Sequence, residues 1–458
     1  MVGAGLAGLA SARTLRAAGH EVTVLERSRL LGGKATSFVA GAPRGPRETE
    51  LAEFRGVEEE VDNGQHVFLG CFDAWRSLVS EVGMADALHL PPRFEVALLG
   101  TGGARARLRA GRLPSPLHLV PALLGHRLLG VGGRLHVARA MSAARHPARP
   151  GETLAGWLHR LGQGPHERAV FWDPFLVPSL NAPLEEVDAE AGLFVLRTAF
   201  LSSPDACRIG WSRIPLGRIA EAVANGLDVH LREPARGLVV EEGVVRGVST
   251  ATGVLPADGV VLAVPPEVAS RLLPAGVEVP GLDRIRSQPI VDVHLWYDAG
   301  RLELPWGLDF AALVGSPVQW VFRKRPGYLC CSLSAAGEVV GLPEAELVER
   351  CHRELARVLP SLREVPPRRG RATRDPAATF VPTPGLRRPG PESGVRGLVL
   401  AGAWTDTGWP ATMEGAVRSG QAAARALLVP TIPAFTRKGS PEAVGEPTFT
   451  RKREVPAG

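Results

Sequence analysis

Short apolar runs alternate with longer amphipathic stretches over most of the chain. The run 21–25 follows a small-residue helical pattern that begins near Leu6 and ends before Gly19, a suitable C-cap. Two later runs, 257–264 and 398–402, have the continuity expected of buried parallel strands. The alternation of strands and helices predicts an α/β fold with a parallel sheet.

The segments between these strands have a different character and predict a second structural unit. Helical periodicity covers 72–90 and 151–205, and the second of these is broken at 180–183 (Leu-Asn-Ala-Pro). Residues 93–113 and 289–335 alternate in the manner of strands or hairpins. An amphipathic helix is predicted over 343–358, with Leu347, Val348, Cys351, Leu355 and Val358 on one face.

Nucleotide-type strands therefore come from three separated pieces of sequence. We predict a discontinuous nucleotide-binding domain of residues 1–75, 206–270 and 370–428. An inserted α+β substrate domain is predicted to comprise residues 76–205 and 271–369.

The turn that begins at Gly3 carries the glycines of a dinucleotide site. Gly3 and Gly5 permit a tight turn and close approach of the backbone to a pyrophosphate, and Gly8 lets the next helix pack on the strand. The N–H groups and positive end of that helix would face the phosphates. Glu26, at the end of the second strand, can accept hydrogen bonds from ribose hydroxyls. With a second Gly-Gly turn at 32–33, this spacing is specific for nucleotide binding.

Only Met1 and Val2 precede these glycines, which is short for a central parallel strand. We therefore expect a native start upstream of Met1 or a truncated chain.

Composition narrows the class of protein. The 53 basic residues exceed the 47 acidic ones, but they are dispersed and not interleaved with aromatic side chains, so nucleic-acid binding is not expected. The five cysteines show no metal-ligand spacing, which favours core thiols, no metal and a cytoplasmic location. The tail, 429–458, is rich in proline and charge and is expected to be disordered.

Residues 113–141 are apolar with sparse Arg and His, and they contain no acidic residue. A buried or domain-capping pair of helices fits this pattern, and so does an interfacial segment that lies on a bilayer. The net charge of +6 weakly favours an anionic membrane surface. Peripheral membrane contact through 113–141 is therefore one of our expectations, whereas no apolar run is long enough to cross a bilayer.

These motifs resemble those of the FAD-dependent amine oxidase and phytoene desaturase superfamily. Within it, the chain looks most like the squalene-associated hydroxysqualene dehydroxylases of bacterial hopanoid pathways. The resemblance spans nearly the whole chain except the tail. It rests on the two glycine turns with Glu26, on 61–66 (Val-Asp-Asn-Gly-Gln-His), on 180–183 and on the block 401–420.

The resemblance implies a Rossmann-type FAD-binding domain, an apolar isoprenoid substrate and other squalene-pathway enzymes as partners. A single flavin also follows from the residues, because 100–103 and 130–133 lack the third glycine of a second nucleotide motif. The implied FAD-binding residues are Gly3, Gly5, Gly8, Glu26, Arg27, Gly32, Gly33, Lys34, Gly402, Thr412 and Met413.

The helix that begins near Pro410 to Met413 would direct its N-terminus at the flavin pyrimidine carbonyl. Ala403 departs from the family, which usually has an acidic residue at that position. The loss of one such hydrogen bond would weaken cofactor binding by about 1–3 kcal/mol.

The implied reaction is the removal of the hydroxyl of hydroxysqualene, which gives squalene. Departure of an allylic hydroxyl needs a proton donor, and the allylic cation needs hydride from the reduced flavin. The candidate acids or positioning groups are His66, Asp62 and Glu414. His66 also fits a turn-bonding role, Asp62 a turn-forming role and Glu414 a helix-capping role.

Two alternatives remain open on the sequence. A carotenoid-type desaturase would run the flavin in the opposite direction, and a non-catalytic flavoprotein of the same pathway is suggested by Ala403. Amine oxidation is less expected, because Lys324 is the one lysine that could serve beside the flavin. Its neighbours Arg323 and Arg325 predict that Lys324 is solvated.

Overall fold

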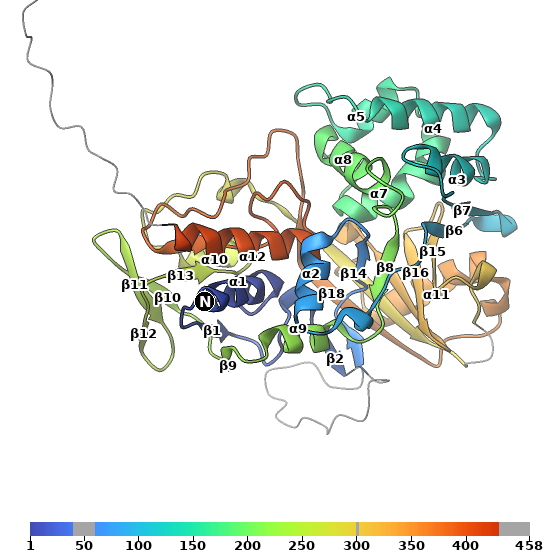
Figure 1. The fold of residues 1–458 in the computed structure, drawn as a ribbon. Helices are drawn as coiled ribbons and strands as arrows, with labels where there is room; N and C mark the ends of the chain where they lie inside the picture. Colours follow the sequence, from blue (N-terminus) through green and yellow to red (C-terminus); the bar gives the residue numbers. More distant parts are fainter. Residues whose placement is uncertain (40–59, 299–301, 430–458) are drawn as a thin grey trace, which may run out of the picture.

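The computed structural model describes residues 1–39, 60–298 and 302–429, and the predicted tail lies outside this range beyond Val429. Two lobes lie side by side (Figure 1). One contains the parallel strands and both ends of the described chain, and the other contains a large sheet, antiparallel except for one parallel strand pair, under a layer of helices. Among the described residues, no helix is long and apolar enough to span a bilayer.

A parallel sheet forms the centre of the first lobe. β1 (Thr23–Glu26) pairs with β9 (Asp228–Leu231), and β13 (Val260–Leu262) pairs with β19 (Leu398–Leu400). Val2 lies between the two pairs, with parallel bridges to both β1 and β13. Its N–H donates to Val261 O at 2.9 Å, and its carbonyl accepts from Ala263 N–H at 2.8 Å. The short segment before Gly3 therefore takes the place of the central strand.

Helices cover one face of this sheet, and a small antiparallel sheet covers the other. α1 (Leu6–Ala17) and α12 (Met413–Leu428) cross so closely that a side chain on Gly420 would lie 2.0 Å from Ala7 O. α9 (Leu216–Ala224) lies beside α1. The opposite face of the sheet is covered by β10 (Gly237–Glu241), β11 (Val244–Ser249), β12 (Val254–Pro256) and α10 (Pro266–Leu272).

The predicted helix over 72–90 is shorter in the structure. α2 (Asp73–Glu81) ends just before Gly83, whose positive φ of 74° reverses the chain, and β5 (Leu88–His89) follows. Leu78 and Val79 of α2 pack in the core of the nucleotide lobe. The predicted domain boundary at 75 therefore falls inside an element of that lobe.

The second lobe is built on a seven-stranded sheet in the order β18-β14-β17-β16-β15-β6-β7. Its strands are β6 (Glu95–Leu99), β7 (Arg105–Arg109), β14 (Ser287–Trp296), β15 (Phe310–Leu313), β16 (Trp320–Arg325), β17 (Tyr328–Leu333) and β18 (Arg369–Phe380). β18 pairs with β14 along its length. Residues 370–380, predicted to belong to the nucleotide-binding domain, therefore belong to the substrate sheet.

The two faces of this sheet have different coverings. α11 (Glu344–Val358) packs on one face through Leu347, Cys351, Leu355 and Val358, as the amphipathic pattern predicts. A helical cap stands over the other part of the lobe (Figure 1). It comprises α3 (Val120–Leu124), α4 (Val131–Ala143), α5 (Leu154–Arg160), α6 (Pro165–Glu167), α7 (Asp173–Leu180) and α8 (Ala189–Val195), with π-helical turns at Arg168–Trp172 and Leu196–Phe200.

Asn181 connects the cap to the sheet and explains the Leu-Asn-Ala-Pro motif. It ends α7 in the left-handed conformation, with a φ of 50°. Its Nδ2 donates to Gln288 O at 3.0 Å and to Thr379 Oγ1 at 2.9 Å, and its Oδ1 accepts from Ala335 N–H at 2.7 Å. Asparagine tolerates this backbone geometry and bonds three segments at once.

Two small sheets lie where the lobes meet. β2 (Ser37–Val39) pairs with β3 (Glu60–Asp62), and β8 (Ile209–Ser212) pairs with both β4 (Val67–Leu69) and β5. The predicted segment 61–66 therefore spans β3 and the loop to β4.

Candidate functional site

The first glycine turn forms a cradle that side chains would fill. Gly3 has a positive φ of 99°, and a Cβ on it would lie 2.4 Å from Ala263 O. A Cβ on Gly8 would lie 2.0 Å from Gly3 O. Gly5 precedes α1 with no side-chain cap and no acidic residue in the first turn of the helix. The positive end of α1 therefore faces the turn through its backbone N–H groups, as anion binding requires.

The second glycine turn packs directly on the first. Gly32 and Gly33 have positive φ values of 92° and 61°, and Gly32 N–H donates to Ala4 O at 3.0 Å. A Cβ on Gly33 would lie 3.0 Å from Gly5 Cα. The two turns predicted from sequence thus form one surface of bare backbone, which permits close approach of a pyrophosphate.

Glu26 lies at the carboxyl end of β1, beside this surface. Its Oε2 accepts from Ala4 N–H at 2.8 Å and its Oε1 from Ser28 N–H at 2.7 Å. These bonds orient the carboxylate and leave lone pairs for ribose hydroxyls. Sequence reasoning missed Glu233, whose N–H donates to Glu26 O at 2.9 Å and whose Oε1 is buried without a hydrogen-bond partner among the described residues. An unpartnered buried acceptor at this edge fits a cofactor hydroxyl.

The late block brings a third segment to the same edge of the sheet. Gly402 follows β19, and its N–H donates to Ser419 Oγ at 2.8 Å. Thr412 caps α12 by accepting from Gly415 N–H at 3.1 Å, and Met413, the first residue of the helix, is buried. Because the carboxyl ends of parallel strands share one edge, the predicted glycines and Glu26 lie along it together with Gly402. Ala403 contributes no carboxylate there.

Two of the predicted cofactor-binding residues, Lys34 and Arg27, do not face the glycine surface in an evident way. Lys34 Nζ donates to Asp375 Oδ2 at 2.7 Å and also to Ala377 O, so it links the second glycine turn to β18. The Arg27 side chain is exposed at the end of β1. A phosphate-binding role for Lys34 and Arg27 stays a prediction.

Asp62 is buried in an ion pair that joins the lobes. Its Oδ2 lies 2.7 Å from Lys324 Nζ, and its Oδ1 accepts from Ser37 Oγ at 2.7 Å and from Leu216 N–H at 2.8 Å. Burial alone would raise the pKa of Asp62, but the Lys324 charge and these hydrogen bonds hold that pKa below its usual value. Asp62 is therefore a fixed carboxylate, and Lys324 is not solvated as its flanking arginines predicted.

Glu414 caps another helix. It is fully buried, and its two oxygens accept from Ala74 N–H at 3.1 Å and Trp75 N–H at 2.8 Å, at the start of α2. Arg418 Nε lies 2.6 Å from Oε1. These bonds give Glu414 a capping and charge-pairing role, and its catalytic role stays a prediction.

His66 retains one ring nitrogen for chemistry. Its Nδ1 lies 2.9 Å from Gly64 O, which can only accept, so neutral His66 carries its proton at Nδ1 and has a lone pair at Nε2. Burial lowers the pKa of His66, against the opposing effect of the bond to Gly64 and of the Asp62 charge. Protonated His66 is therefore a stronger acid than a solvated imidazolium.

A second buried carboxyl group, Asp292 of β14, lies beneath the 63–66 loop and was missed in the sequence. Its Oδ1 accepts from Gln65 N–H at 3.3 Å, and burial raises its pKa to about 6. A Cβ on Gly64 would lie 2.9 Å from Asp292 Oδ2 and 3.8 Å from His66 Cε1, so the two groups flank Gly64. The available signal was an Asp between two valines in a strand-like run.

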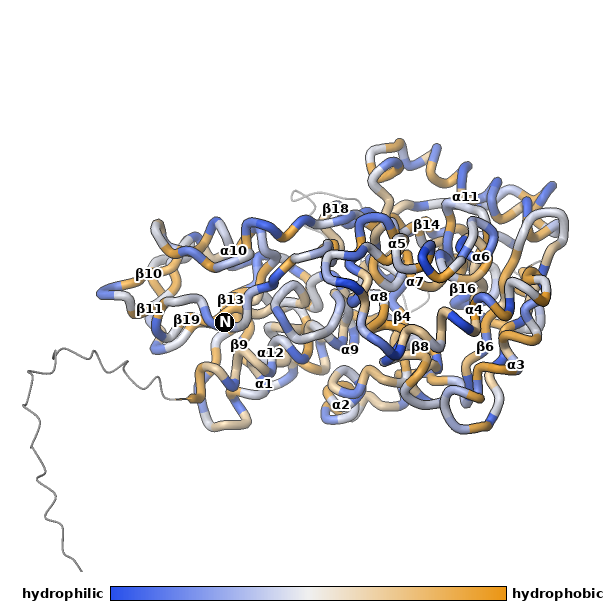
Figure 2. The backbone as a smooth tube through the Cα atoms, turned by 90° about the horizontal axis from the view of Figure 1, so that it is seen from above, coloured by the Kyte–Doolittle hydropathy of each residue, from blue (hydrophilic) through white to orange (hydrophobic). Residues whose placement is uncertain are grey.

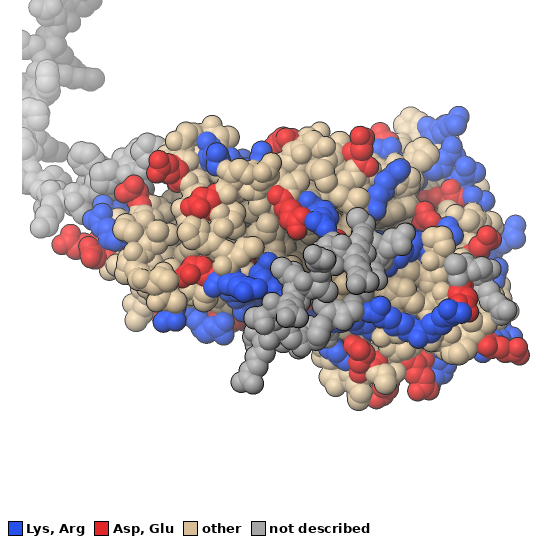
Figure 3. Space-filling model, turned by 90° about the horizontal axis from the view of Figure 1, so that it is seen from below, with Lys and Arg blue, Asp and Glu red and all other residues tan. Residues whose placement is uncertain are grey.

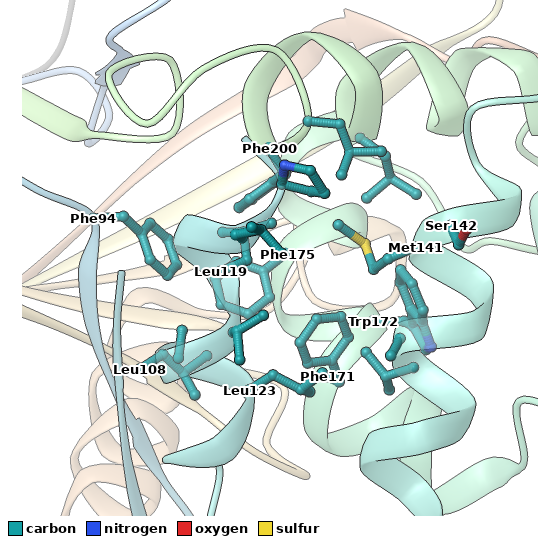
Figure 4. Close-up of a pocket in the computed structure, with 18 of the residues that line it drawn as sticks. Phe94, Leu108, Leu119, Leu123, Met141, Ser142, Phe171, Trp172, Phe175 and Phe200 are labelled. Carbon is teal, nitrogen blue, oxygen red and sulfur yellow. The ribbon is translucent and has the colours of Figure 1, made fainter. Parts of the chain in front are cut away.

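An apolar cavity of about 270 Å³ lies between the cap and the sheet (Figure 4). Phe94 and Leu108 approach it from the sheet side, and Phe171 and Trp172 approach it from the cap. Arg145 is the one ionisable side chain among its lining residues. Such a lining suits a hydrocarbon and offers no carboxylate to an amine.

Aromatic side chains continue from this cavity along the sheet. The Phe175 ring, which lines the cavity, lies 5.9 Å from the Trp320 ring, and Trp320 lies 6.0 Å from Phe322. Side chains alternate along a strand, so Trp320 and Phe322 of β16 share one face, and both belong to the hydrophobic cluster that contains Val61, the residue before Asp62. The apolar wall therefore leads towards Asp62 and the 63–66 loop.

The fold and the glycine cradle define a two-lobed flavoprotein with one dinucleotide site. Residues 6–428 match the family of flavin containing amine oxidoreductases, and the chain belongs to that family. FAD is its cofactor: the bare glycine surface, Glu26 and the unpartnered Glu233 oxygen fit a dinucleotide at one edge of the sheet.

Relatives of known name include hydroxysqualene dehydroxylases and phytoene desaturases. The chain is 30% identical to hydroxysqualene dehydroxylase of Rhodopseudomonas palustris over 93% of this chain and 97% of that one. It is also 30% identical to the enzyme of the same name from Sinorhizobium fredii, over 94% and 98%. A 15-cis-phytoene desaturase of Narcissus pseudonarcissus is 24% identical over 93% of this chain and 79% of its own.

Solved structures confirm the predicted fold. An oxidoreductase from Methanosarcina mazei superposes with a TM-score of 0.68 at 17% identity, covering 93% of this chain and 99% of that one. Cyclohexylamine oxidase from Brevibacterium oxydans gives a TM-score of 0.66 at 18% identity, covering 93% and 97%. These structures confirm the predicted α/β fold, and the family match with the 30% identical relatives confirms the prediction of an FAD-dependent oxidoreductase.

Proposed function

We propose that this protein is an FAD-dependent hydroxysqualene dehydroxylase. In the reaction, the allylic C–O bond of hydroxysqualene breaks, a proton joins the departing hydroxyl as water, and a hydride forms the new C–H bond of squalene. The hydride would come from reduced FAD when it is bound, with oxidised flavin as the other product. The chain must bind the hydrocarbon, exclude water and supply the proton.

The apolar cavity is the observation that carries this proposal. Its lining is aliphatic and aromatic, with Arg145 as its one ionisable member. The aromatic wall from Phe175 through Trp320 extends this environment towards the 63–66 loop. A long isoprenoid can therefore lie in the cap with its functional group near the junction of the lobes, where developing charge is shielded from water.

We assign the role of proton donor to His66. The carboxyl oxygens of Asp62 and Glu414 already accept hydrogen bonds from the protein, whereas His66 Nε2 has no hydrogen bond to the described residues. Protonated Nε2–H would donate to the departing hydroxyl. The Asp62 and Asp375 charges favour the imidazolium and Lys324 opposes it, while burial lowers the pKa most strongly. Turnover should therefore fall as the pH rises through this lowered pKa.

A product assay tests the proposal. Purified protein loaded with FAD is reduced under anaerobic conditions, given hydroxysqualene and extracted for chromatography with mass detection. We expect squalene in proportion to reduced flavin. Absence of squalene, with conjugated polyene formed from phytoene by the oxidised enzyme, would instead identify a desaturase. His66→Asn should bind FAD normally and lose most turnover, since its amide cannot donate as an acid.

The cytoplasmic location is also part of this proposal. Its support is that the five cysteines are unpaired thiols, four of them buried. Alkylation under denaturing conditions, after acid quenching of the cells to trap the thiols, should show all five reduced.

A further inference from the structure

The cap exposes an unusual concentration of large apolar side chains. Half of the large apolar side chains that the described chain exposes lie within 113–135, although this is a small part of the sequence. Their exposed fractions run from 44% for Val120 to 73% for Val131. The set, called the apolar rim below, consists of Leu113, Leu117, Val120, Leu124, Val131 and Leu135.

The position of the rim explains its exposure. α3 and α4 stand at the outer corner of the cap, at the far end of the molecule from the nucleotide lobe (Figure 1). α4 buries only Val137 and Ala140, so most of its surface faces outward. In Figure 2 the tube at α3 is mostly orange, the colour of hydrophobic residues, and of these Val120 and Leu124 are exposed. Exposed apolar patches of this kind mark interaction sites.

The charge around the rim has one sign. No acidic residue occurs between Glu95 and Glu152, whereas exposed arginines recur through this stretch. Those beside the rim are Arg112, Arg127, Arg139 and Arg145. Elsewhere, as on the face in Figure 3, acidic and basic side chains are interspersed. Apolar residues bordered by arginines match an anionic lipid surface.

The rim is continuous with the substrate cavity. Leu117 is 53% exposed and Val120 is 44% exposed, yet both line the cavity. The mouth of the cavity therefore lies within the apolar rim. A second copy of this chain is a less suitable occupant, because a symmetric contact would place the two sets of arginines against each other.

We propose that the apolar rim docks on an anionic lipid bilayer and that the cavity takes up its substrate directly from that bilayer. The uptake step rests on the proposed isoprenoid substrate; the docking step does not. Arginines meet the headgroups while the rim leucines and valines enter the acyl boundary, which places the mouth where a hydrocarbon is dissolved.

Flotation of the FAD-loaded full chain tests docking. The vesicles contain phosphatidylcholine with or without phosphatidylglycerol. We expect binding to the anionic vesicles, weakened by high salt, and a loss of at least about tenfold in the Leu124→Glu/Val131→Glu variant. Neither residue lines the cavity. The matched control is Val254→Glu on β12, whose residue is 55% exposed on the other lobe and should leave binding unchanged.

Turnover separates docking from chemistry. With hydroxysqualene dispersed in detergent, the double variant should match the wild type; with substrate embedded in anionic vesicles, it should be slower by about the loss seen in flotation. If neither protein makes squalene in detergent, the proposed function fails while flotation still decides docking. Docking is overturned if the wild type does not float, if Val254→Glu weakens binding equally, or if sedimentation shows a dimer that the double variant abolishes.

Discussion

The ion pair between Asp62 and Lys324 is the contact whose removal tests the architecture most directly. The two charged atoms lie 2.7 Å apart, and the side chains are 5% and 20% exposed. Lys324→Met would leave a buried carboxylate without its cation, since methionine fills a similar volume without charge. Removal of one partner of a buried pair destabilises a protein by about 3–5 kcal/mol.

This free energy converts to a measurable change in melting temperature. At about 2.1 cal/mol/K per residue, the 458-residue chain has an unfolding entropy of about 1 kcal/mol/K, so Tm should fall by about 3–5 °C. The control is Arg353→Met, which removes an exposed pair with Glu349 at 3.2 Å and should shift Tm by less than about 1 °C. Lys324→Arg should recover part of the loss.

The pH dependence gives an independent check. Because the pKa of Asp62 is lowered in the folded protein, its pairing stabilises the fold above the ordinary carboxyl pKa. That stability is lost as the pH falls through the lowered pKa. The Tm difference between wild type and Lys324→Met should therefore be full at pH 7.5 and shrink in acid. Calorimetry of Asp62→Asn, Lys324→Met and the double variant completes the cycle. Additive effects, with no coupling energy, would refute the buried-pair interpretation.

Three further changes test the cradle and the buried carboxyls. Gly8→Ala should purify without flavin absorbance, since its Cβ would lie 2.0 Å from Gly3 O, whereas Gly132→Ala meets nothing within 4 Å and should keep FAD. Glu414→Gln should lower unfolding stability by about 1–3 kcal/mol while turnover per bound flavin stays unchanged, and lost turnover would restore its catalytic candidacy. Asp292 has a folded pKa of about 6, so its ionisation destabilises the fold as the pH rises through that value. Asp292→Asn should therefore raise Tm at pH 8 and lose this gain near pH 4; an equal gain at both would contradict the assignment.

Local sequence rules predicted the parts of the site that depend on backbone. Gly3, Gly8 and Gly33 were predictable from sequence because each position excludes a side chain or requires a positive φ. Only glycine meets these requirements easily. Glu26 was predictable because its distance from the glycines follows from the length of one helix and one strand. The apolar runs at 257–264 and 398–402 became parallel neighbours, as their composition predicted.

Contacts between distant segments were not predictable in this way. β18 was predicted to belong to the nucleotide-binding domain but belongs to the substrate sheet. Its mixed polarity gives no local signal of this, because its place in the sheet depends on pairing with β14. Lys324 was expected to be solvated because it is flanked by arginines in the sequence. In the structure it forms a largely buried ion pair with Asp62, which is 262 residues away in the sequence. The burial and hydrogen bonding of Asp292 also depend on a distant segment, the 63–66 loop that lies over it. Only tertiary pairing determines the environment of such charges.

Two ion pairs between distant segments join the lobes, and a third polar connection joins the cap to the sheet within the substrate lobe. Lys34 of the second glycine turn reaches Asp375 on β18 at 2.7 Å, and Asp62 beside β2 reaches Lys324 on β16. Asn181 ties the cap to β14, β18 and the turn after β17. The sheet that carries Asp292 is thus bonded to the glycine turns on one side and to the cap with its cavity on the other. The motif residues therefore have two roles. The turns that approach the cofactor also hold the substrate lobe against the nucleotide lobe. Weakening Lys324 should consequently disturb substrate alignment before it disturbs flavin binding, which the bare backbone of the cradle provides.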